Sequence, residues 1–195
     1  MKVALFGGSF NPVHNGHLEI ANRIIKEMIA DEVWFIPCRN HPFDKELISG
    51  QDRINMIKLA IDNLPKLRVI DLEILSNKIS YTSETIQYLN DKFKEIEFYF
   101  IIGSDNLINL QKWHNFEYLR YNVKFILVKR PGFEIVNTLG IRVVHTLQME
   151  NKVSSTKIRD FLLNCNSVKE MIPNQVEQYI KREELYHEKL LCKSC

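Results

Sequence analysis

Short apolar runs alternate along this chain with segments whose apolar residues recur every three to four positions. Six runs read as buried strands, at 3–6, 32–38, 67–74, 96–102, 123–129 and 141–147. Strands that alternate with helices form βαβ units, whose right-handed crossovers require a mostly parallel sheet covered on both faces. The sequence therefore predicts an α/β fold: a single doubly wound domain over 1–186 with a C-terminal helical segment, followed by a tail at 187–195.

The helical segments carry their own start signals. Apolar residues from Leu18 to Ile29 line one face of a helix, and Ser49 with Asp52 resembles a capping box that opens the next. Thr82 or Ser83 is expected to cap a helix over 81–93. Two short helices are expected within 104–121, and longer ones at 154–165 and 174–186. In such a Rossmann-like sheet, ligands bind at the carboxyl ends of the strands.

The bulk composition narrows the class of protein. A chain of 195 residues that is 45% hydrophobic can bury one sizeable core, and a net charge of +2 argues against a nucleic-acid partner. No apolar run is long enough for a membrane span, so a cytoplasmic location is expected. The cysteines show no disulfide framework, and the lone pair Cys192 and Cys195 is interpreted as tail thiols rather than half of a zinc site. The sequence leaves open whether the chain forms a homo-oligomer.

The segment "GGSFNPVHNGH", residues 7–17, follows the first predicted strand. Glycines let a main chain turn and approach a phosphate, so backbone N–H groups could form a cradle at Gly7, Gly8, Ser9 and Phe10. His14 and His17, three residues apart at a helix entry, lie on one side of it. They could donate to the charge that develops in phosphoryl transfer, cap and pack the helix, or form a metal pair that lacks a nearby third ligand.

A second segment, "VSSTKIRDFL", opens a late helix. Hydroxyl and N–H groups at a helix start suit phosphate oxygens, and Arg159 adds a charged fork within about one turn. The group comprises Ser154, Ser155, Thr156 and Arg159. By itself this pattern is only a capping signal; beside the opening motif it indicates a triphosphate clamp.

These segments resemble the two signatures of the nucleotidyltransferase superfamily, G-x-F-x-P-x-H-x-G-H and [ST]-S-x-x-[IVL]-R. "YTSET", "GSDNLINLQKW" and "KRPGF" are similar to segments of the bacterial nicotinate-mononucleotide adenylyltransferases, and the similarity extends from residue 2 to 186. The resemblance implies transfer of AMP from ATP to nicotinate mononucleotide, with release of pyrophosphate, in NAD biosynthesis. Mg²⁺ would be held by the phosphates, with no metal site made by the protein.

The resemblance also implies roles for single residues, each with a structural alternative. Gly103 and Asp105 would meet ATP, Asp105 through a ribose hydroxyl or else as a helix cap. Trp113 would stack on the pyridine ring or pack in the core. Thr82 would bind the nicotinate carboxylate or cap its helix. Arg130 would reach a phosphate or lie on the surface.

One stretch departs from the pattern. Where the family carries P-P-H-K, this chain has "NHPFDK", which retains Lys45 for a phosphate but places Asp44 beside it. Rival functions are a relative that uses nicotinamide mononucleotide or phosphopantetheine, and a nucleotide-binding sensor without catalysis.

Overall fold

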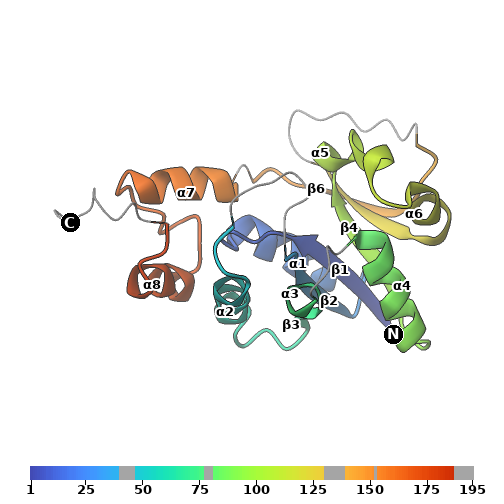
Figure 1. The fold of residues 1–195 in the computed structure, drawn as a ribbon, viewed down its shortest axis with the longest axis horizontal. Coiled ribbons are helices and arrows are strands. Elements are labelled where there is room, and N and C mark those ends of the chain that lie inside the picture. The colour runs from blue at the N-terminus through green and yellow to red at the C-terminus, as the bar shows by residue number, and fades with distance from the viewer. Residues whose placement is uncertain (40–46, 77–80, 130–138, 152, 187–195) are drawn as a thin grey trace.

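A computed structural model describes residues 1–39, 47–76, 81–129, 139–151 and 153–186 of the chain. Its centre is a six-stranded sheet of order β3-β2-β1-β4-β5-β6, in which every strand pair is parallel (Figure 1). The strands are β1 (Lys2–Gly8), β2 (Glu32–Pro37), β3 (Leu67–Val69), β4 (Glu97–Gly103), β5 (Lys124–Lys129) and β6 (Arg142–Gln148). The predicted doubly wound, parallel fold is confirmed.

Helices cover both faces of the sheet. They are α1 (Asn15–Lys26), α2 (Gly50–Ala60), α3 (Leu72–Leu75), α4 (Thr82–Lys92), α5 (Ser104–Leu107), the 3-10 helix η1 (Leu110–Lys112), α6 (Phe116–Asn122), α7 (Ser155–Leu163) and α8 (Asn174–Arg182). One apolar core lies between the sheet and α1, α2, α7 and α8, and a second lies between the sheet and α4 and α6. Strands buried on both faces must be apolar on both sides, which explains their continuous apolar runs.

Three local expectations differ from the structure. The strand expected at 67–74 ends at Val69, and the chain turns into α3 with Asp71 as its N-cap. Tyr81 is the N-cap of α4, so the expectation that Thr82 or Ser83 caps this helix is wrong: Thr82 is already helical. The segment 104–121 forms three short pieces, α5, η1 and α6, instead of two helices.

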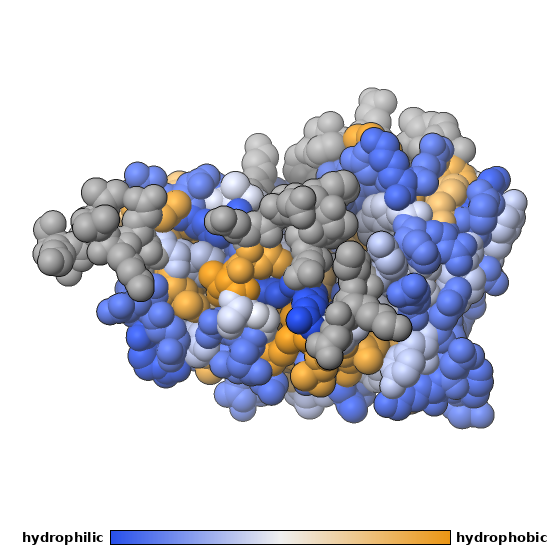
Figure 2. All heavy atoms as spheres, in the orientation of Figure 1, coloured by the Kyte–Doolittle hydropathy of each residue, from blue (hydrophilic) through white to orange (hydrophobic). Residues whose placement is uncertain are grey.

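The direction of winding reverses at β1. This strand lies between β2 and β4, so the loops that follow β1 and β4 leave the sheet at the point where the strand order switches. In Figure 1, α7 and α8 lie at one end of the molecule and α4, α5 and α6 at the other. Apolar surface gathers in the middle of the visible face, between hydrophilic ends (Figure 2).

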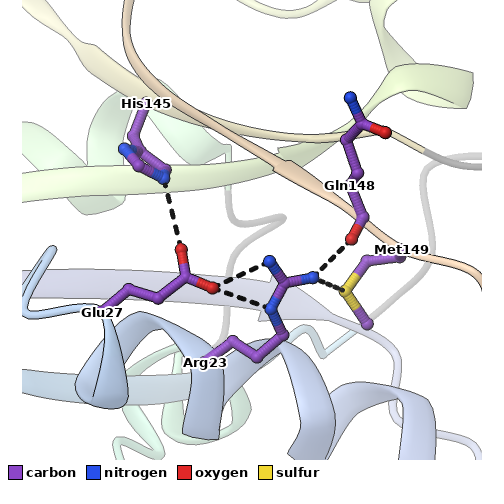
Figure 3. A network of polar contacts seen from close by, with 5 residues as sticks. All are labelled: Arg23, Glu27, His145, Gln148 and Met149. Atoms are coloured by element: carbon purple, nitrogen blue, oxygen red, sulfur yellow. Dashed lines mark hydrogen bonds and ion pairs between the residues drawn. The ribbon is translucent and has the colours of Figure 1, made fainter.

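A polar network fastens α1 to the strand at the sheet edge (Figure 3). Arg23 donates to the carbonyl oxygen of Gln148 and to the sulfur of Met149, and its guanidinium pairs with Glu27 at 2.8 Å. Nε2 of His145 lies 3.6 Å from the second carboxylate oxygen of Glu27. These contacts fix the end of β6, from which the chain leads to α7. Within the described ranges, no helix is both long and apolar enough to cross a bilayer.

Candidate active site

Gly7 and Gly8 are the last two residues of β1, which runs beyond the strand expected at 3–6, and aromatic rings pack closely on both. A Cβ atom on Gly7 would lie 3.2 Å from the ring of Phe100, and one on Gly8 would lie 3.1 Å from the ring of Phe10. Both distances are shorter than ordinary van der Waals contact. The missing side chains thus let two aromatic rings support the loop from the interior while its main chain faces the carboxyl edge of the sheet.

Phe10 anchors this loop in the core. Its side chain is 1% exposed, and its ring meets Phe6 edge-on at 5.6 Å and His17 at 4.9 Å. Its backbone has a φ of 46°, a left-handed conformation that a bulky residue adopts only when its surroundings hold it there. Any contribution of Phe10 to a phosphate cradle therefore comes from its amide group.

The two histidines lie together at the start of α1. His14 is the N-cap and is 4% exposed, and its ring stacks on that of His17 with the centroids 3.6 Å apart. Nδ1 of His17 accepts a hydrogen bond from the backbone N–H of His14 at 3.2 Å. Because Nδ1 supplies a lone pair, the neutral His17 ring carries its proton on Nε2, which makes that atom a hydrogen-bond donor.

The start of α7 is bound directly to the loop after β1. The hydroxyl of Ser155 donates to the carbonyl oxygen of Pro12 at 2.8 Å, and Nη1 of Arg159 donates to that of Asn11 at 2.8 Å. The two motifs, about 140 residues apart in the chain, therefore lie side by side, as the sequence predicts (Figure 1). Arg159 is also held by Thr156, whose hydroxyl oxygen accepts at 3.4 Å.

The serines of this segment have structural partners. Ser154 is the N-cap of α7, and its hydroxyl oxygen accepts from the backbone N–H of Lys157 at 3.3 Å. The hydroxyl proton of Ser155 is used by Pro12. The backbone amide groups of Ser155 and Thr156, which have no partner within a helix, are thus donors that this segment can offer to an anion besides the Arg159 guanidinium.

The C-terminal segment also contacts the loop after β1 and the start of α1, which was not expected from the sequence. The hydroxyl of Tyr186 donates to Oδ1 of Asn11 at 2.7 Å, and Asn11 is 2% exposed. The side chain of Asn15 donates to the carbonyl oxygen of Glu170 at 2.8 Å, and its backbone N–H donates to that of Met171 at 2.8 Å. No sequence signal links these partners, because they are more than 150 residues apart.

A second cluster lies at the start of α4. The hydroxyl of Ser83 lies 3.2 Å from Nδ1 of His114, whose ring stacks on Tyr81 with the centroids 4.2 Å apart. Thr82 is the first residue of α4, and Trp113 meets Phe100 edge-on at 6.2 Å. Phe100 also packs against Gly7, so this cluster and the histidine loop share one supporting ring. His114, interpreted from the sequence as an ordinary surface or core residue, is part of this cluster.

Glu73 fixes the orientation of α4. Its carboxylate accepts from the Thr85 hydroxyl at 2.8 Å, and burial raises the pKa of this carboxyl above its ordinary value. The bond joins α3 to the first turn of α4. The departure of the chain from a strand at residue 70 is therefore what brings Glu73 to the neighbouring helix.

The remaining expected site residues fall into two groups. Gly103 ends β4 and is the N-cap of α5, and Asp105 lies in the first turn of that helix. Both are thus at the carboxyl edge, beside β1 in the sheet. Lys45 and Arg130 lie outside the described residues, as does the 187–195 tail. Among the residues that the structure does describe, no group of three or more His, Cys, Asp or Glu side chains could hold a metal ion.

Comparisons with known proteins agree with this architecture. Residues 5–161 match the family model described as cytidylyltransferase-like. The probable nicotinate-nucleotide adenylyltransferase of Bacillus licheniformis is 36% identical over 95% of this chain and 98% of its own length. The nicotinate-nucleotide adenylyltransferase of Bacillus subtilis is 33% identical over the same shares.

A solved structure has the same fold. The nicotinic acid mononucleotide adenylyltransferase of Plasmodium falciparum, complexed with NaAD, superposes with a TM-score of 0.82 at 25% identity, over 95% of this chain and 97% of that one. Sequence relatives of nearly full length and a shared fold lead to one conclusion: the chain belongs to the nicotinate-nucleotide adenylyltransferase family, within the cytidylyltransferase-like proteins.

Proposed function

We propose that this chain transfers the adenylyl group of ATP to nicotinate mononucleotide, forming nicotinate adenine dinucleotide and pyrophosphate in NAD biosynthesis. One observation carries the proposal: Ser155 and Arg159 bind the carbonyl oxygens of Pro12 and Asn11, so both anion-binding segments border one site. A triphosphate that lies along the loop after β1 meets the start of α7 and the Arg159 guanidinium on its other side.

The residues around the triphosphate supply donors rather than a nucleophile. Backbone amides between Gly7 and Phe10, at the end of β1 and in the loop that follows it, bind phosphate oxygens together with those of the first turn of α7. Nε2–H of His17 donates to the charge that develops on the α-phosphate, since its Nδ1 is fixed by the His14 backbone.

The reaction needs no covalent enzyme intermediate. A phosphate oxygen of nicotinate mononucleotide attacks the α-phosphorus in line, a new P–O bond forms, and the bond from the α-phosphorus to the bridging oxygen breaks. The electron pair of that bond leaves with pyrophosphate. The attacking phosphate is already an anion at neutral pH, so no general base is required. Magnesium enters with the substrate as MgATP and neutralises charge on the triphosphate.

The acceptor binds at the cluster that starts α4. Thr82, at the N-terminus of this helix, offers its hydroxyl and the positive end of the helix dipole to the nicotinate carboxylate. Trp113 offers an aromatic face to the pyridine ring. On the ATP side, Gly103 and Asp105 at the end of β4 meet the nucleoside. Lys45 and Arg130 remain candidates for phosphate contacts.

The test is pyrophosphate release by the purified chain with MgATP and one acceptor at a time. We expect rapid release with nicotinate mononucleotide, and far less with nicotinamide mononucleotide or phosphopantetheine. Failure of all three acceptors, while ATP still binds, would favour a sensor and overturn the proposed activity. A preference for another acceptor would overturn the assignment of the substrate.

A further inference from the structure

Arg53 is a buried cation that neither motif contains. It lies on α2, its residue is 1% exposed, and it is among the largest fully buried side chains described. Nη1 donates to the carbonyl oxygens of Ser9 at 2.9 Å and Cys38 at 2.7 Å. The other nitrogens donate to the carbonyl oxygens of Ile48 and Arg39, each at 3.3 Å. One side chain thus joins the loop after β1, the loop after β2 and the start of α2.

Within the part of the chain that the structure describes, no carboxylate cancels the positive charge of Arg53. Among the described residues, its guanidinium forms hydrogen bonds with carbonyl oxygens and no ion pair with a carboxylate. Burial lowers the pKa of Arg53 below its ordinary value, yet an arginine remains protonated at neutral pH. Burial also raises the pKa of the Cys38 thiol, which therefore stays neutral. A full positive charge lies directly under the loop.

The contact with Ser9 sets the direction of an amide group. In a planar trans peptide the C=O and N–H bonds point in opposite directions. Because the Ser9 carbonyl points inward to Arg53, the N–H of Phe10 points away from the interior. The carbonyl oxygen of Gly8 accepts from the backbone N–H of Cys38 at 2.9 Å, which likewise turns the N–H of Ser9 away from β2.

We propose that Arg53 is a positioning residue for adenylyl transfer: it holds the Ser9–Phe10 peptide so that its amide faces the triphosphate, and it adds a fixed positive charge behind that amide. The inference rests on the proposed function, because it assumes that ATP phosphates lie along this loop. It also accounts for the left-handed backbone of Phe10, which needs an outside contact to persist.

The experiment compares ATP with adenosine, which shares the nucleoside but has no phosphates. Arg53→Gln removes the charge and most of the donors, Arg53→Lys keeps the charge without the fork, and Arg23→Gln removes another arginine that donates to a carbonyl oxygen (Figure 3). Loss of one charge-assisted contact predicts a Kd for MgATP about 10- to 100-fold higher in R53Q, with the Kd for adenosine within about twofold. R53K should fall between R53Q and the wild type, and R23Q should bind like the wild type.

Urea unfolding of each variant shows whether it is folded under the binding conditions. A measurement on the wild type does not depend on folding of the variants: the Ser9 and Phe10 amide signals in a ¹⁵N spectrum should shift with MgATP and not with adenosine. The inference is overturned if these amides do not respond to MgATP, or if folded R53Q loses affinity for ATP and adenosine equally or for neither. Failure of the proposed function shows separately, as absent pyrophosphate release by the wild type.

Discussion

The bond between Tyr186 and Asn11 allows a sharp test of how the C-terminal segment supports the site. Tyr186→Phe removes one hydroxyl, which donates to Oδ1 of Asn11 at 2.7 Å, and leaves the ring in place. Burial holds the pKa of Tyr186 well above its ordinary range, so the phenol is a neutral donor at any assay pH. Asn11 is 2% exposed, so water does not readily replace the lost donor.

The expected cost follows from this burial. Removing one partner of a buried hydrogen bond costs about 1–3 kcal/mol of the free energy of unfolding. A cost of about 2 kcal/mol corresponds to a fall of about 4–8 °C in Tm for a chain of this length. Activity should fall as well, because the carbonyl oxygen of Asn11 holds Arg159. Displacement of that guanidinium should lower kcat about 10- to 100-fold.

Tyr179→Phe is the matched control. The Tyr179 hydroxyl donates to Asp52 at 2.7 Å and accepts from Asn55 at 2.9 Å, so this bond joins α8 to α2 and does not involve the loop after β1. Its loss should cost similar stability and leave kcat within about twofold of the wild type. Thermal unfolding and pyrophosphate release measure both quantities. If Y186F retained full kcat, or if Y179F lost as much activity as Y186F, the C-terminal segment would not position Arg159.

Three further substitutions test other parts of the site. His17→Ala should lower kcat by about 10²–10³-fold, with a much smaller change in the Kd for ATP. Steady-state kinetics and calorimetry measure these two quantities, with H145A as a control. Near-normal turnover of H17A would remove His17 from the mechanism. Gly16→Ala places a Cβ atom 3.1 Å from Nδ1 of His14, so it should lower kcat while circular dichroism shows an intact fold; unchanged kcat would mean that the ring can move without loss. Glu73→Gln should be more stable than the wild type at neutral pH. Because the folded pKa of Glu73 is raised, the folded state binds the extra proton and the stability of the wild type falls as pH rises above about 4.5. The advantage of E73Q in urea unfolding should therefore shrink toward about pH 4, and an advantage that is independent of pH would contradict this reasoning.

The architecture and the position of the two main motifs follow from the amino-acid sequence alone. The period of the apolar residues distinguishes strands from helices, and an alternation of the two leaves little choice but a parallel, doubly wound sheet. Capping at Ser49 and at Ser154 was also readable, because a cap depends on residues three positions apart. Both motifs follow strands, and the carboxyl ends of parallel strands share one edge.

The groups that support those motifs can be identified only in the folded protein. The apolar run at 67–74 suits a strand, yet contacts with β2 and α4 turn its second half into α3, which carries Glu73 to Thr85. In the sequence, nothing distinguishes Arg53 from an arginine on a helix surface. In the structure, α2 packs under the loop after β1 and the residue is buried. Tyr186 and Asn11 are 175 residues apart in the chain and meet only in the folded protein. Local preferences depend on neighbours in the chain, whereas these contacts depend on distant segments that burial of the two cores brings together.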